Sequence, residues 1–165
     1  MQIRLSRKAD SQAIRDVHLR AFPTRTEADL VDQLMADGDA VMSIVAEDGD
    51  IVGHVLLSRM NVIADGQALD GLGLAPVAVV PDRQREGIGS ALIEAAVGKA
   101  KSTGVQILFL LGEPAFYRRF GFTVAAAKPF ESPYAGPYFQ ALPLVDLRPA
   151  RSGVARYAPA FDRLG

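Results

Sequence analysis

The stretch Gln84-Arg85-Glu86-Gly87-Ile88-Gly89-Ser90 decides how this sequence is interpreted. An apolar run, Leu74–Val80, precedes it and predicts a buried strand, and apolar residues recur at helical spacing over 88–97 behind it. Backbone N–H groups at the start of a helix have no partner within the helix, so they favour an anion, typically a phosphate. Because Gly87 and Gly89 lack a Cβ, a bulky diphosphate can approach the main chain. The stretch therefore predicts a pyrophosphate-binding turn.

Two better-known phosphate-binding patterns do not fit this turn. A P-loop requires Gly-Lys followed by Ser or Thr, and the turn has no such sequence. A dinucleotide-binding fingerprint requires a glycine at the position where this chain has Leu92. What remains is Gln-x-x-Gly-x-Gly after a strand that ends in Val-Pro-Asp (80–82). This pattern resembles motif A of the GNAT superfamily of N-acetyltransferases, which holds the pyrophosphate of acetyl-CoA.

Composition predicts one globular domain. The chain has 165 residues, of which 49% are apolar and 22% charged, and its net charge of −1 gives no reason to expect a nucleic acid partner. The absence of cysteine excludes disulfides, thiolate catalysis and cysteine-based zinc sites, and two separate histidines predict no metal site. The first residues are too charged for a signal peptide, and no apolar run approaches the roughly 18 residues of a membrane span. We therefore expect a cytoplasmic protein with no membrane partner.

The spacing of apolar residues predicts alternating strands and helices. Strands are expected over 3–5, 43–46, 51–63, 72–80 and 107–111. Helices are expected to begin near Asp10, at Thr26, at the glycine turn and at Pro114. Six of the ten prolines lie from residue 129 onward, which predicts a loop-rich tail with one or two edge strands. The order βααβββαβαβ indicates a single α/β domain with a mixed sheet.

A second motif follows one helix and one strand after the turn. Tyr117-Arg118-Arg119-Phe120-Gly121-Phe122 matches the Y-x-x-x-G-F pattern that ends a short helix in many GNAT enzymes. Together the two motifs resemble GNAT acetyltransferases, and more narrowly a YhbS-like bacterial branch, over roughly residues 1–125. The resemblance implies a single-domain GNAT-like fold over 1–165, with a mixed central β-sheet of about six to seven strands flanked by about four α-helices.

The resemblance also implies which residues bind acetyl-CoA. The main chain of Val77, Ala78 and Val79 is expected to run beside the pantetheine arm, with the Val79 N–H as donor to the developing oxyanion. The diphosphate is expected on the residues of the turn, which are Gln84, Arg85, Glu86, Gly87, Ile88, Gly89 and Ser90.

Three residues are candidates for catalysis. Tyr117 is the expected general acid, because a phenol with a pKa near 10 suits protonation of the coenzyme thiolate; the alternative is an aromatic residue that packs a short helix. His54 has a pKa range that suits a general base, although a histidine among apolar strand residues also fits a core position. Glu27 lies where relatives often place acceptor-binding residues, and an acidic residue in the first turn of a helix also has a structural role.

The function implied is an acetyl-CoA-dependent N-acetyltransferase that acts on a primary amine, of a small molecule or a protein, by direct transfer in a ternary complex. The alternative is a non-catalytic acyl-CoA-binding or regulatory module with the same fold. This alternative is favoured by Gly112-Glu113-Pro114-Ala115, where many relatives carry an asparagine that contacts the cofactor. The tail, 126–165, is expected either to wall the acceptor pocket or to be a loop pinned by buried aromatic residues. We expect a monomer or homodimer.

Overall fold

Residues 1–163, the part of the chain that the computed structural model describes, contain nine strands and five α-helices. The strands form a mixed sheet in the order β1-β2-β3-β5-β6-β8, to which β4 and β9 are joined through β3 and β7 through β9. The predicted α/β class with a mixed sheet is therefore confirmed. None of the helices in residues 1–163 combines the length and the apolar character needed to cross a membrane.

The chain divides into two compact units. Unit 1 consists of Met1–Ser58, Ala75–Gly98 and the described part of Pro159–Gly165, and unit 2 consists of Arg59–Leu74 and Lys99–Ala158. The chain passes between the units within three elements, namely β3 (Asp50–Ala64), β5 (Gly71–Val79) and α3 (Ile88–Ser102).

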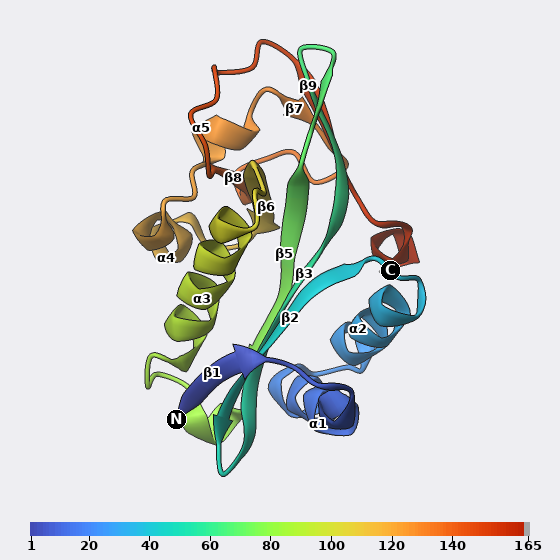
Figure 1. Cartoon of the computed structure of the whole chain (residues 1–165), viewed down its shortest axis with the longest axis vertical. Helices are drawn as coiled ribbons and strands as arrows, with labels where there is room; N and C mark the ends of the chain where they lie inside the picture. Colours follow the sequence, from blue (N-terminus) through green and yellow to red (C-terminus); the bar gives the residue numbers. More distant parts are fainter. Residues whose placement is uncertain (164–165) are drawn as a thin grey trace. The chain divides into compact units, whose positions relative to one another are not determined.

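Unit 1 is built on an antiparallel sheet of β1 (Gln2–Leu5), β2 (Ala40–Asp48) and the first part of β3. Helices α1 (Ser11–Ala21) and α2 (Thr26–Ala36) pack against each other and follow β1 in the chain (Figure 1). The β2–β3 hairpin carries an irregularity, because Glu47 lies opposite Ile51 whereas Ala46 lies opposite Gly53. This bulge shifts the register of every pair from Ala46 to Met42 by one residue.

The start of α3 packs closely on β3 at Gly53. A Cβ on this glycine would meet the Leu92 Cδ1 atom of α3 at 2.9 Å and the Ala78 carbonyl oxygen of β5 at 3.2 Å. The next residue, His54, contacts His18 of α1 instead. Because side chains alternate across a strand, α3 and α1 lie on opposite faces of β3.

Unit 2 combines two sets of strand pairs. The first part of β5 pairs in parallel with β6 (Ile107–Leu111), which pairs antiparallel with β8 (Phe139–Pro143). The last part of β3 pairs with β4 (Gln67–Leu69) and β9 (Gly153–Tyr157), and β9 pairs with β7 (Phe130–Glu131) (Figure 1). The short helices α4 (Pro114–Tyr117) and α5 (Val124–Ala127) follow β6 in the chain.

The tail contains more regular structure than its prolines predict. It holds three strands, β7, β8 and β9, instead of one or two. The reason is that none of these prolines occupies the interior of a strand: Pro143 ends β8, Pro159 begins a short 3-10 helix, and the others lie in loops, so no interior strand position loses its N–H donor. The Phe109 ring of β6 packs against the Phe130 and Phe139 rings at 5.1 and 5.4 Å between centroids, which makes these tail aromatics part of the core of unit 2.

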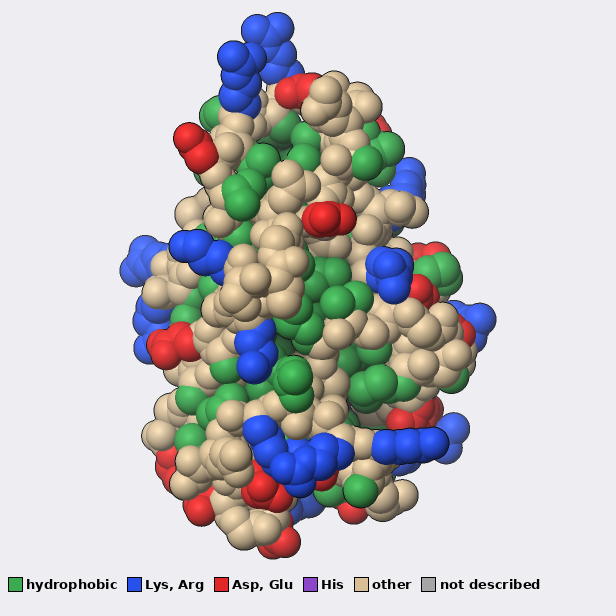
Figure 2. All heavy atoms as spheres, viewed as in Figure 1, with side chains coloured by type: hydrophobic (Ala, Val, Ile, Leu, Met, Phe, Trp, Pro, Cys, Tyr) green, Lys and Arg blue, Asp and Glu red, His purple; other side chains and the backbone are tan. Residues whose placement is uncertain are grey.

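The surface has no extended region of one charge on the face that Figure 2 presents. Lys and Arg side chains are interspersed there with Asp and Glu side chains and with apolar patches (Figure 2). This mixture agrees with the net charge of −1.

Candidate functional site

The glycine turn between β5 and α3 has the backbone conformation of an anion-binding turn. Arg85 and Gly87 both have positive φ angles, of 66° and 85°. The Ala91 N–H donates to the Gly87 carbonyl oxygen at 3.0 Å, so the N–H groups of Ile88 and Gly89 precede the first such bond of α3. A Cβ on Gly87 would meet no atom within 4 Å, so the space beside it is open. The turn therefore offers backbone donors and the positive end of a helix dipole to an anion.

Side chains on both sides of the turn hold it in place. The Arg83 guanidinium donates to the Asp48 carboxylate of the β2–β3 hairpin at 2.9 Å and to the Glu86 carboxylate at 3.0 Å. The Gln84 Nε2 atom donates to the Val79 carbonyl oxygen at 3.0 Å. The predicted residues of the turn and of β5 are thus brought together, because Gln84 ties the turn to the end of the strand.

The main chain of β5 near Val79 has one edge that faces away from β3. The Val80 N–H donates to the Val52 carbonyl oxygen of β3 at 2.9 Å. Because successive N–H groups of a strand point to opposite edges, the Val79 N–H points away from β3. Pairing of β5 with β6 covers only Gly71–Gly73. The Val79 N–H is consequently on an edge that a ligand can join.

His54 belongs to a chain of four hydrogen-bonded side chains in unit 1. Its Nδ1 atom lies 2.8 Å from the Nε2 atom of His18, and its Nε2 atom lies 2.8 Å from the Ser43 hydroxyl. The Ser6 hydroxyl lies 2.7 Å from that of Ser43. Both imidazoles are fully buried, and the Nδ1 atom of His18 has no hydrogen-bond partner among the described residues. This series of hydrogen-bonded side chains therefore extends from the partly exposed end of β1 into the interface between β3 and α1.

The two imidazoles are neutral in the folded protein near pH 7. Burial lowers the pKa of His18, and it lowers the pKa of His54 together with the proximity of His18. A neutral imidazole carries one N–H, so the hydrogen bonds run either from Ser6 toward His18 or from His18 toward Ser6. When all the hydrogen bonds of this series reverse their direction, one proton equivalent is moved from one end of the series to the other.

Glu27 lies in the first turn of α2 and is half-buried. Its Oε1 atom is inaccessible to solvent and has no hydrogen-bond partner within residues 1–163. A buried carboxylate oxygen without a donor is costly, so this oxygen is available to accept a hydrogen bond from a bound group.

Tyr117 lies in unit 2 at the end of α4. Burial raises the pKa of its phenol above its ordinary value. Its ring contacts the Phe116 and Phe122 rings edge-on, at 4.9 and 6.2 Å between centroids. A Cβ on Gly112 would overlap the Tyr117 ring. The Tyr117 ring can occupy its observed position only because residue 112 is glycine. Any larger side chain at this position, asparagine included, would overlap the ring.

Three residues that matter for this arrangement were not identified as such from the sequence. Gly112 was noted only as a departure from a pattern, and its contact with Tyr117 depends on how α4 folds back on β6. His18 enters the sequence analysis only as one of two separate histidines, and its partnership with His54 follows from the packing of α1 on β3. Ser43 belongs to no sequence motif that would have indicated its hydrogen bond to His54. Within the described residues, no group of three histidine, aspartate or glutamate side chains is placed to hold a metal ion.

Comparison with known proteins agrees with this geometry. Residues 2–125 match the family described as "Acetyltransferase (GNAT) domain". The chain is 37% identical over 134 residues to "Uncharacterized N-acetyltransferase YjhQ" of Escherichia coli K12, an alignment that covers 79% of this chain and 74% of that protein.

Two solved structures are similar along almost the whole chain. One is the GNAT family N-acetyltransferase YhbS from Escherichia coli in complex with CoA, with a TM-score of 0.90, 30% identity, and coverage of 99% of this chain and 93% of that one. The other is a GNAT family acetyltransferase from Brucella melitensis in complex with acetyl-CoA, with a TM-score of 0.80, 35% identity, and coverage of 98% and 97%.

Proposed function

This chain belongs to the GNAT family of N-acetyltransferases, in its YhbS-like branch, and from that premise we propose that it moves the acetyl group of acetyl-CoA to a primary amine. The acceptor is an amine of a small molecule or of a protein, and transfer is direct, in a ternary complex. The donor is supported by the two similar structures, which hold CoA and acetyl-CoA. The sequence motifs predicted the same family and the same donor.

The observation that carries the proposal is the glycine turn at the start of α3. Its left-handed residues Arg85 and Gly87 lead into α3, the N–H groups of Ile88 and Gly89 precede the first hydrogen bond of that helix, and ion pairs hold the turn in place. A diphosphate bound there gains several hydrogen bonds and the field of a helix of 15 residues. The residues proposed to bind the donor are those of 84–90 together with the main chain of Val77, Ala78 and Val79.

Transfer forms one C–N bond and breaks the C–S bond of the thioester. The chain has no cysteine, so we propose that the amine attacks the thioester carbon itself. We propose that the Val79 N–H, which points away from β3, donates to the oxyanion. Tyr117 gives its phenol proton to the departing thiolate, and the raised pKa of that phenol keeps it protonated at neutral pH.

The proton that the amine loses requires an acceptor. His54 is fully buried, so its proposed role as base operates through the hydrogen-bonded chain that His18 and Ser43 form with it. Glu27 is the second residue proposed to interact with the amine, because no described residue donates a hydrogen bond to its buried Oε1 atom. We propose that Glu27 holds the amine of the acceptor.

The test is an assay of thiol release from acetyl-CoA against a panel of amines. The protein contributes no thiol of its own, so the measured thiol is coenzyme A alone. Tyr117→Phe is expected to lower kcat by about 10²- to 10⁴-fold, the usual contribution of a general acid, while CoA still raises the melting temperature. Glu27→Gln is expected to raise KM for the amine, and His54→Gln is expected to alter the pH profile of kcat.

Three outcomes contradict parts of the proposal. If the protein binds acetyl-CoA and releases no thiol with any amine, it is a non-catalytic acyl-CoA-binding module. If Tyr117→Phe leaves kcat unchanged, Tyr117 is not the acid. If millimolar CoA does not raise the melting temperature, the turn is not a donor site, since a ligand that prefers the folded state must stabilise it.

A further inference from the structure

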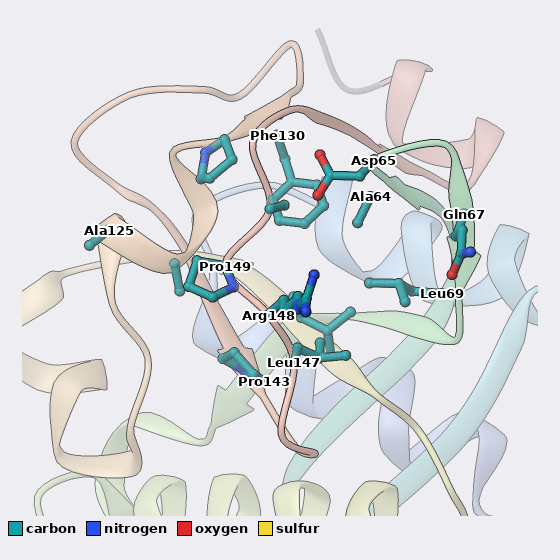
Figure 3. Close-up of a pocket in the computed structure, with 14 residues that line it drawn as sticks. Ala64, Asp65, Gln67, Leu69, Ala125, Phe130, Pro143, Leu147, Arg148 and Pro149 are labelled. Carbon is teal, nitrogen blue, oxygen red and sulfur yellow. The ribbon is translucent and has the colours of Figure 1, made fainter.

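Unit 2 contains a pocket that the proposed transfer reaction does not use. It has a volume of about 500 Å³ and lies between the β3–β4 hairpin, α5 and the segment 143–150 (Figure 3). Its wall includes Ile107, the first residue of β6, whereas Tyr117 follows the last residue of that strand. The pocket and the proposed acid are therefore at opposite ends of β6.

The wall of the pocket is apolar because the core of unit 2 is incompletely covered here. Ala64, Leu69, Ala126 and Leu147 pack against that core and remain only partly buried, and all four line the pocket. Behind them lies the buried Phe130 ring, which Phe109 holds edge-on at 5.1 Å between centroids. The pocket thus offers an apolar surface with a fixed aromatic ring to the body of a ligand.

Arg148 is the one basic side chain that lines this pocket. Figure 3 shows its guanidinium in the middle of the ring of lining residues, directed toward the space below Phe130 and Ala64. No ion pair joins it to any residue within 1–163. An arginine that is not neutralised by the protein presents a planar set of donors suited to a carboxylate.

The other polar groups of the wall are less suited than Arg148 to bind a carboxylate. The Asp65 carboxylate already accepts the N–H groups of Arg151 at 3.0 Å and Ser152 at 3.1 Å, which fixes the segment after the pocket to the β3–β4 hairpin. Three of the lining residues, Pro129, Pro143 and Pro149, have no N–H to donate. Among the side chains of the wall, only Arg148 and the Gln67 amide are hydrogen-bond donors.

We propose that this pocket binds a small monocarboxylate with an apolar, preferably aromatic, body. The carboxylate pairs with the Arg148 guanidinium and the body lies against Phe130 and Leu69. A volume of about 500 Å³ falls within the range of small-molecule sites and accommodates a ligand of about 10 to 15 non-hydrogen atoms. The ligand is neither donor nor acceptor in the transfer reaction, so binding is expected with and without coenzyme A.

The experiment is a titration of the full chain with 3-phenylpropanoate, followed by calorimetry and by NMR shifts, beside the matched neutral 3-phenylpropanamide. The acid is expected to bind with a millimolar or lower Kd, and the amide at least about tenfold more weakly, the loss expected when a charge-assisted pair is removed. Saturating CoA is expected to leave the Kd of the acid unchanged.

Three variants complete the test. Arg148→Gln is expected to raise the Kd of the acid at least about tenfold, while Arg151→Gln, which changes a neighbouring exposed arginine outside the wall, leaves it unchanged. Ala126→Leu fills the pocket and is expected to abolish binding of both acid and amide while the protein stays folded. The proposal is overturned if the acid does not bind at 20 mM, if acid and amide bind equally, if Arg148→Gln keeps the affinity, or if CoA displaces the acid.

Discussion

The Nε2 atom of His18 and the Nδ1 atom of His54 lie 2.8 Å apart, and both rings are completely buried between α1 and β3. One of these nitrogens must carry a proton and the other must not, so the two rings cannot both be charged without breaking their hydrogen bond. Burial also disfavours a single charge on the pair, so both rings are neutral near pH 7.

This pair predicts a loss of stability in mild acid. Burial lowers both pKa values in the folded state, so the unfolded chain binds more protons below pH 6.5, and the free energy of unfolding falls as the pH falls. The expected loss between pH 6.5 and 5 is about 1 to 2 kcal/mol for each imidazole. Urea unfolding at several pH values measures it.

The double variant His18→Gln, His54→Gln is the control, and its stability should be nearly flat over the same range. The range lies above the pKa of most carboxylates, which keeps their titration out of the comparison. A wild-type protein that is equally stable at pH 6.5 and 5 would show that both imidazoles bind protons as readily in the folded protein as in the unfolded chain.

Gly87→Ala should separate stability from donor binding. Gly87 has a φ of 85° and open space around it, so alanine is expected to cost about 1 to 2 kcal/mol of folding free energy through its left-handed backbone. Gly38→Ala, at a φ of 74° and with equally open surroundings, carries the same strain after α2. Only Gly87→Ala is expected to raise the Kd for CoA, by about tenfold or more. Equal CoA affinities in the two variants would exclude close approach of the ligand to Gly87.

Gly112→Ala should impair catalysis through Tyr117. The added methyl group overlaps the ring, which must move, and a displacement of about 1 Å at a reacting group can cost about 10²-fold in rate. The measurement is kcat in wild type, in each single variant and in the double variant Gly112→Ala, Tyr117→Phe. In the Tyr117→Phe background the alanine is expected to have little further effect. Additive losses would mean that Gly112 acts on something other than the phenol.

Gly98→Ala is expected to stabilise the protein. Gly98 lies inside α3, has no positive φ, and a Cβ there would meet no atom within 4 Å. Alanine in a helix interior is favoured over glycine by about 1 kcal/mol. Thermal unfolding should show a higher melting temperature with unchanged CoA affinity, and a lower melting temperature would mean that α3 packs on a surface this structure does not include.

The fold and the family were predictable because their signals are local. The glycine turn, the apolar strand before it and the amphipathic helix after it are consecutive in the sequence, and the motif at 117–122 follows at the expected distance. Similarity to the structure of YhbS over 99% of the chain agrees with the predicted fold and family.

The surroundings of His54 were not predictable, because they depend on one extra residue in the β2–β3 hairpin. Without the bulge at Ala46 and Glu47, the register of the turn would place His54 opposite Ile44. With the bulge, His54 lies opposite Val45, on the same face as Ser43, and the hydrogen-bonded chain can form. No feature of the sequence marks that irregularity.

The pocket at Arg148 was beyond prediction for a different reason. Its wall comes from segments near residues 64–69, 125–130 and 143–150, and none of these carries a recognisable motif. Their proximity results from the pairing of β9 with β3 and of β8 with β6.

The close packing at Gly53 has a consequence for how such an enzyme can change over evolutionary time. Gly53 allows the Leu92 side chain of α3 to lie close to β3, and the proposed donor-binding turn leads into that helix. A methyl group at this buried position would be too close to the Leu92 Cδ1 atom, so either that side chain or α3 must shift, and a shift of α3 would move the backbone amides of the turn. A substitution outside the proposed donor site can therefore change the geometry of that site.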